Sequence, residues 1–174
     1  MQGSERTKLK IQKHSIDELI NALMSSDGVL RNEARLELVK MGEFAIDFLA
    51  ELVNHSNDRV RWEAIKAMGE IKSPLAIPFF IDALEDEISS VRWLAAEGLI
   101  SLENEGLKAV LESLIELKDS YLLDQSAHHV LYELNKELKD VKIAELNVLL
   151  EHSREKFRIP ILAKEILDGM RNRN

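Results

Sequence analysis

A short pattern that recurs at nearly constant spacing is the feature that most limits how this chain can fold. Residues 60–64 and 91–95 share the pattern Val-Arg-Trp-x-Ala, and their first positions lie 31 residues apart. Weaker copies begin at Leu30, Leu123 and Ile159. A period of this length is typical of repeat proteins, in which each unit can bury its apolar stripe only against the next unit.

Each copy of the pattern begins a stretch of helical periodicity. In the copy that starts at Val60, the apolar residues Ala64 and Ala67 follow at spacings of four and three, which places them on one side of a helix. Another helical stretch precedes each copy, and no alternating run is long enough to favour a sheet. The sequence therefore predicts an all-α fold, an α-solenoid of about five antiparallel helical hairpins.

The two ends of the chain differ in charge from its middle. The formal net charge is -8, yet residues 1–14 hold four basic side chains against one acidic, and residues 153–174 hold six against three. We interpret residues 1–14 as a basic N-terminal tail and residues 15–174 as a single repeat domain. The acidic middle repels phosphate backbones, which makes nucleic acid an unfavourable partner and favours cationic or neutral ones.

Composition also limits the compartment. The sequence contains no cysteine, which excludes disulfides, thiolate metal sites and cysteine nucleophiles. The longest apolar stretch, residues 74–81, is too short to span a membrane, and the first residues lack the apolar core of a secretory signal. We therefore expect a cytoplasmic protein that does not bind membranes.

Several turns and helix starts resemble one repeat family. Residues 84–96 combine Leu-Glu-Asp with Val-Arg-Trp-Leu-Ala-Ala, residues 57–61 read Asn-Asp-Arg-Val-Arg, and residues 73–78 read Ser-Pro-Leu-Ala-Ile-Pro. These segments resemble the HEAT-repeat superfamily, in particular the short HEAT-like repeats of about 30 residues named after phycobilisome lyases. The resemblance covers roughly residues 15–171 and implies the fold more than the function, because the superfamily consists mostly of scaffolds and adaptors with a few enzymes.

The resemblance also implies a ladder of hydrogen bonds along the solenoid. In that family an acid in each hairpin turn and an arginine at the start of the second helix form its rungs. The matching residues are Asp27 with Arg31, Asp58 with Arg61, and Asp86 with Arg92. Asp124 and Pro160 occupy the arginine position in the last two hairpins, which leaves a different stacking open there.

The same resemblance implies a binding face. In HEAT-like arrays the second helices line the concave side, and residues after the ladder arginine point outward. The candidate peptide-binding residues are Trp62, Trp93, Glu63, Lys66, Glu70, Leu94, Glu97, His129 and Glu133. Tryptophan is a frequent hot-spot residue, and carboxylates around it suit an apolar or basic segment through cation–π contacts. The sequence leaves open whether the two tryptophans line this groove or pack against each other between repeats.

No pattern in the chain predicts catalysis. His128 and His129 are adjacent and lie on different sides of their helix, so they cannot simply share a metal, and His129 with Glu133 is better explained as an exposed surface pair. The chain lacks a glycine-rich phosphate loop, a nucleophile elbow, and the His-Glu dipeptides of the di-iron branch of this repeat family. We predict no catalytic residue, no metal site and no cofactor.

These observations lead to one hypothesis and one alternative. The hypothesis is a non-enzymatic scaffold that binds a peptide or protein segment in an acidic, tryptophan-containing concave groove. The alternative is a HEAT-like enzyme or enzyme subunit, either similar to the chromophore lyases or similar to the DNA-alkylation-repeat proteins that process nucleic acid. Polar residues in the terminal hairpins, such as Asp17, Glu18, Lys164 and Asp168, resemble capping repeats and favour a monomer.

Overall fold

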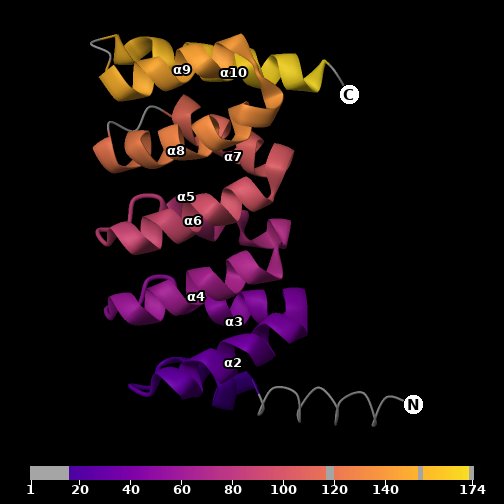
Figure 1. Ribbon diagram of the computed structural model, residues 1–174, viewed down its shortest axis with the longest axis vertical. Helices are drawn as coiled ribbons and strands as arrows, with labels where there is room; N and C mark the ends of the chain where they lie inside the picture. The colour runs from indigo at the N-terminus through magenta and orange to yellow at the C-terminus, as the bar shows by residue number, and fades with distance from the viewer. Residues whose placement is uncertain (1–15, 117–119, 153–154, 173–174) are drawn as a thin grey trace.

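The structure is a computed structural model that describes residues 16–116, 120–152 and 155–172. Five helical hairpins stack along its long axis (Figure 1), and the described residues contain no β-strand. The predicted all-α solenoid of five hairpins is confirmed. Residues 1–14, predicted to form a basic tail, lie outside the described residues.

Each hairpin consists of a first helix and a second helix. The first helices are 16–23, η1 Gly42–Ala45 with α3 Ile46–Ala50, η2 Pro74–Ala76 with α5 Ile77–Ala83, α7 Glu103–Ile115 and α9 Val141–His152. The second helices are α2 Gly28–Met41, α4 Asp58–Ile71, α6 Ser89–Ser101, α8 Tyr121–Leu138 and α10 Ile159–Arg171, with η3 Lys156–Arg158 before α10.

Local sequence explains where the helices begin. The side chain of Asp27 accepts a hydrogen bond from the Val29 amide at 2.8 Å, and the side chain of Asn57 accepts one from the Arg59 amide at 3.0 Å. These side chains satisfy amides of the first helical turn that have no partner inside the helix. At η2, Ser73 is the cap and a proline follows at the first helical position.

The hairpins form two layers with the apolar core between them. Helices α2, α4, α6 and α8 pack one on the next and form the second-helix layer, while α5 and α7 pack together in the first-helix layer. Fully buried side chains from successive hairpins fill the seam, among them Leu38, Met68, Phe80, Leu99 and Leu131. Each hairpin therefore hides its apolar stripe against its neighbours, as the repeat period requires.

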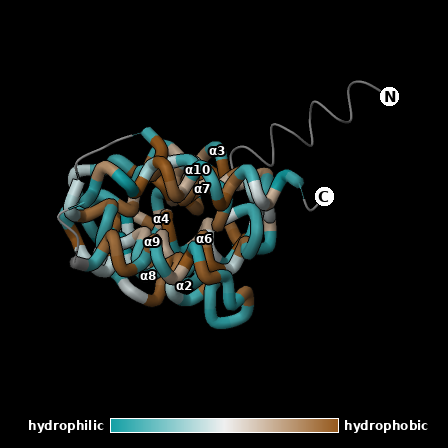
Figure 2. The backbone as a smooth tube through the Cα atoms, turned by 90° about the horizontal axis from the view of Figure 1, so that it is seen from above, coloured by the Kyte–Doolittle hydropathy of each residue, from teal (hydrophilic) through white to brown (hydrophobic). Residues whose placement is uncertain are grey.

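The last hairpin exchanges the two layers. Helix α9 packs on α8, whereas α10 packs on the first helix α7. In the view along the stack, α10 lies with α3 and α7, and α9 lies with α2 and α8 (Figure 2). The expectation that every second helix shares one face is therefore wrong for α10. Pro160 replaces the ladder arginine there, and Ile159, Leu162 and Ile166 of α10 are buried.

The ends of the stack are polar only in part. The predicted capping residues Asp17, Glu18, Lys164 and Asp168 are exposed, but α9 also exposes Val148. The monomeric state therefore stays a prediction. Among the described residues, no helix combines the length and the apolarity that crossing a membrane requires.

Candidate functional site

The repeat period places the two tryptophans at equivalent positions on neighbouring helices. Trp62 lies in α4 and Trp93 lies in α6, and these helices pack against each other. We call the outward side of α4, α6 and α8 the tryptophan face. Its residues are Trp62, Lys66, Trp93, Glu97, His129 and Glu133.

Trp62 is half-buried and already has a cationic neighbour. The ammonium group of Lys66 lies 4.5 Å from the centroid of the Trp62 ring. The two side chains are four positions apart on α4, a spacing that brings side chains together on a helix surface. The chain thus forms its own cation–π contact at this point of the tryptophan face.

Trp93 is much more accessible than Trp62. Its side chain is 55% exposed, and Glu97 follows it by one helical turn. The Glu97 carboxylate also lies 3.1 Å from Nε2 of His129, which links α6 to α8. Trp93 therefore does not seal the joint between repeats, and its exposed ring lies one helical turn before Glu97 on α6.

The other predicted groove residues are divided between surface and core. Glu133 is partly exposed, and a hydrogen bond from Lys136 at 2.7 Å lowers the pKa of its carboxyl group below the ordinary value. Glu70 is exposed and lies 3.4 Å from Nε of Arg35. Leu94 is half-buried and packs against the core.

Glu63 does not belong to the exposed face, so its assignment as a ligand-binding residue is corrected. Its side chain is buried between α2 and α4, where it accepts hydrogen bonds from Nε of Arg31 at 3.1 Å and Nη1 of Arg35 at 2.7 Å. Two guanidinium groups compensate the buried carboxylate, which explains its position. Sequence reasoning missed Arg35, which follows Arg31 by one helical turn.

The ladder arginines make the same backbone contact in three hairpins. Each donates from Nη1 to the carbonyl oxygen six residues earlier, at the end of the preceding turn. The acceptors are Ser25 for Arg31 at 2.9 Å, His55 for Arg61 at 2.9 Å, and Asp86 for Arg92 at 2.8 Å. These bonds fix each turn to its own second helix.

The acids that meet the arginines come from the next hairpin. Arg31 reaches Glu63, and Arg61 forms a bidentate pair with Asp86 at 2.6 and 2.9 Å. The acids matched by sequence within the first two hairpins do something else, since Asp27 caps α2 and Asp58 accepts from the Arg59 amide. Each of these two contacts therefore joins two neighbouring hairpins.

One later joint has the opposite polarity. Asp124 of α8 occupies the arginine position and is buried, and Nζ of Lys156 in the next hairpin lies 2.7 Å from its carboxylate. The ion pair again connects consecutive hairpins, but here the second helix supplies the anion and the next hairpin supplies the cation. The sequence departure at Asp124 therefore still places an ion pair at the joint.

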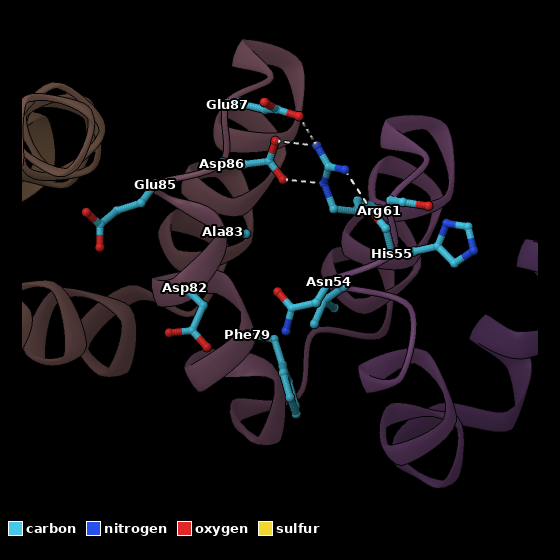
Figure 3. A pocket seen from close by; sticks show the side chains of 11 residues that line it. Asn54, His55, Arg61, Phe79, Asp82, Ala83, Glu85, Asp86 and Glu87 are labelled. Atoms are coloured by element: carbon cyan, nitrogen blue, oxygen red, sulfur yellow. Dashed lines mark hydrogen bonds and ion pairs between the residues drawn. The ribbon is translucent and has the colours of Figure 1, made fainter.

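The pair of Arg61 and Asp86 is enclosed on both sides. Both side chains are about nine-tenths buried, and Figure 3 shows the guanidinium between Asp86, Glu87 and the turn at His55. Burial alone would raise the pKa of Asp86, but hydrogen bonds from Arg61 and the Ile88 amide outweigh it and lower that pKa. The bond to Asp86 raises the pKa of Arg61 above its usual range.

We expect acid to remove the contribution of Asp86 to the free energy of unfolding. The pKa of Asp86 is lower in the folded than in the unfolded chain. Ionised Asp86 therefore stabilises the fold at pH values above its ordinary pKa of about 3.8. The contribution disappears as pH falls through the lowered folded value. Urea unfolding of the wild type and of Asp86→Asn, measured at several pH values, should show their difference shrinking below that point. A difference independent of pH would contradict the assignment.

A cavity of about 380 Å³ lies beside this rung, at the edge formed by the hairpin turns (Figure 3). Asn54 and His55 come from one turn, and Phe79, Asp82 and Glu85 come from α5 and the turn that follows it. Neither tryptophan lines this cavity. The tryptophan face is thus a separate, open surface on the second-helix layer.

The histidines of α8 connect hairpins. His129 reaches Glu97 on one neighbour, and His128 lies 3.9 Å from Glu151 on the other. Adjacent positions on the helix thus point to opposite neighbours. Within the part of the chain that the structure describes, no group of three or more histidine, aspartate or glutamate side chains is placed to hold a metal ion.

Comparisons with known proteins agree with this architecture. The sequence profile of HEAT repeats matches residues 16–100 and again residues 46–132. No curated protein matches the sequence. A structure of the complex of CpcE and CpcF of phycocyanin lyase from Nostoc sp. PCC7120 is similar with a TM-score of 0.59 and 24% identity, over 87% of this chain and 97% of that one.

Two engineered proteins are also similar. One has a TM-score of 0.45 and 19% identity over 95% of this chain and 83% of its own. The other has a TM-score of 0.44 and 24% identity over 95% and 84%.

Proposed function

Because the chain belongs to the HEAT-repeat family, we propose that it is a non-enzymatic interaction scaffold whose tryptophan face binds a peptide or protein segment. The observation that supports this most directly is the exposure of Trp93, whose ring is 55% accessible on a layer of packed helices. A rigid aromatic ring covers a large area at little entropic cost, which suits it to anchor a partner.

The helices around Trp93 provide a firm platform for such an anchor. Helix α6 packs on α4 and on α8, and the Arg61–Asp86 pair fixes the first of these joints. The contact between Glu97 and His129 links the second. Binding on such a preorganised surface costs little conformational entropy in the scaffold.

The face also carries polar groups suited to a rim. Glu97 and Glu133 are partly exposed, and Lys136 is exposed beside Glu133. Polar groups around an aromatic centre are the usual arrangement of a protein interface. An acidic or mixed rim around Trp93 favours a partner segment with apolar and basic side chains.

The enzyme alternative has a narrower basis. The phycocyanin lyase complex shares 24% identity with this chain, a level at which the likeness establishes the fold alone. A role in handling a chromophore would require the tryptophan face to bind a bilin. Addition of biliverdin to the protein tests this directly, since bound bilin changes its absorption spectrum, and such a change lost in Trp93→Ala would favour the alternative.

A displayed library of random twelve-residue peptides, selected on the wild-type protein, tests the scaffold function. We expect selected peptides to bind Trp93→Ala at least about tenfold more weakly, the cost of losing a hot-spot residue. Affinity is measured by isothermal titration calorimetry, a readout that does not depend on the tryptophan that Trp93→Ala removes.

The matched control is Phe157→Ala. Phe157 is an aromatic residue that is 67% exposed on η3, outside the tryptophan face. Its replacement should leave the affinity of the selected peptides unchanged. Peptides that bind Trp93→Ala as tightly as the wild type would overturn the proposed function.

A further inference from the structure

The chain contains a template for how a cation sits on its tryptophan face. On α4, the Lys66 ammonium lies 4.5 Å from the Trp62 ring centroid. The equivalent positions one repeat later are Trp93 and Glu97, since both lie 31 residues further along. The same helical geometry therefore recurs on α6, with a carboxylate where the first site has an ammonium group.

The difference between lysine and glutamate at these equivalent positions changes which charged group each tryptophan ring can bind. At Trp62 the chain supplies its own cation, and the ring is half-buried. At Trp93 the ring is more than half exposed, and the Glu97 side chain beside it is 41% exposed. An electron-rich ring and a carboxylate one helical turn apart both attract a cation, and the two attractions add in the same place.

We infer that Trp93 and Glu97 bind a lysine or arginine side chain of the partner segment, in the position that Lys66 takes over Trp62. This inference rests on the proposed function, because it assigns the chemistry of the segment bound there. The cation stacks on the Trp93 ring and pairs with the Glu97 carboxylate. His129 holds that carboxylate from the α8 side at 3.1 Å and so fixes its place beside the ring.

The first test places a lysine of the chain itself beside the Trp93 ring. In Glu97→Lys, the introduced lysine has the spacing to Trp93 that Lys66 has to Trp62, so its ammonium should fold over the Trp93 ring. Ring currents then shift the side-chain methylene protons of the introduced lysine upfield in the NMR spectrum. Lys66 in the same spectrum is the internal reference, and Lys66→Glu removes that reference signal. Unshifted protons on the introduced lysine, beside shifted ones on Lys66, would overturn the inference.

The second test uses two synthetic peptides and the wild-type protein. One has twelve residues of alternating lysine, glycine and leucine, and the other has norleucine in place of each lysine. In isothermal titration calorimetry, the wild-type protein should bind the lysine peptide about tenfold more tightly than the norleucine peptide, the effect of a partly desolvated cation–π contact supported by a carboxylate. Glu97→Gln should weaken the lysine peptide and leave the norleucine peptide unchanged.

The outcomes separate the inference from the proposed function. Equal binding of both peptides, lost in Trp93→Ala, would support a binding face and refute the cation. Tighter binding of the lysine peptide that persists in Trp93→Ala would refute the site itself. A shifted introduced lysine with selected peptides that ignore Trp93 would leave the cation site in place and refute the scaffold function.

Discussion

Arg61→Ala should lower the free energy of unfolding by about 3 kcal/mol, the cost of removing one partner of a buried ion pair. The substitution leaves the Asp86 carboxylate, which is only 8% exposed, without its bidentate donor. It also removes the bond to the His55 carbonyl that ties the turn to α4. We expect the loss in urea unfolding monitored by circular dichroism, and faster amide exchange at the joint between α4 and α6.

Two further variants distinguish the loss of the Arg61–Asp86 ion pair from a general effect of removing a positive charge. Arg59→Ala removes an exposed arginine from the same helix and should change stability by less than about 0.5 kcal/mol. Combining Arg61→Ala with Asp86→Asn should recover part of the loss, because the buried charge is gone while the side chain still caps the Ile88 amide. A cost for Arg61→Ala no larger than that for Arg59→Ala would show that the rung does not hold the joint.

The helical-hairpin architecture can be predicted from the sequence because residues close together in the chain determine it. The spacing of Val60, Ala64 and Ala67 places apolar side chains along one side of a helix. The 31-residue repeat predicts that this apolar stripe packs against the equivalent stripe of the next hairpin. Caps such as Ser73 before a proline set helix starts through bonds within two residues. Features encoded at such short range need no knowledge of the neighbouring hairpins.

The errors concern contacts that depend on the neighbouring hairpin. Glu63 follows Trp62 directly, so helical periodicity places it at the border between the exposed and buried sides. Its burial is decided by Arg31 and Arg35 on α2, which the pattern of α4 cannot reveal. The family pattern likewise pairs Arg61 with Asp58 of its own hairpin, whereas the structure supplies Asp86 from the next one.

The sequence gives only a weak indication that the two layers exchange in the last hairpin. Pro160 at the arginine position indicated that the regular joint was broken, but not what replaces it. Whether α10 packs on α8 or on α7 depends on which surface the preceding hairpin leaves open. The tryptophan face therefore ends at α8, and α9 continues the second-helix layer above it.

The binding face and the ladder divide the second helices between two tasks. On α4, Arg61 pairs with Asp86 at the joint to the next hairpin, while the adjacent Trp62 lies on the tryptophan face in contact with the Lys66 ammonium group. Consecutive residues of one motif thus hold the stack together and shape its surface. Substitutions at Trp93 or Glu97 should therefore change binding with little effect on stability, whereas Arg61→Ala should change stability first.

Gly106→Ala should lower the free energy of unfolding by about 3 kcal/mol, at the upper end of what overpacking costs. A single residue, Leu102, separates α6 from α7, so the first turn of α7 lies against the last turn of α6. A β-carbon on Gly106 would overlap the carbonyl oxygen of Leu99. That atom belongs to the backbone of α6 and cannot move as a side chain does, so the whole turn must shift.

Gly69→Ala is the matched control, because it adds the same methyl group inside a helix of the same layered stack. Its β-carbon would lie 4.0 Å from the Cα atom of Gly98, an ordinary contact, so the higher helix propensity of alanine should stabilise the protein by up to about 1 kcal/mol. The two variants should therefore move the midpoint of urea unfolding in opposite directions. Equal midpoints would mean that the turn between α6 and α7 is looser than the close approach of Gly106 and Leu99 requires.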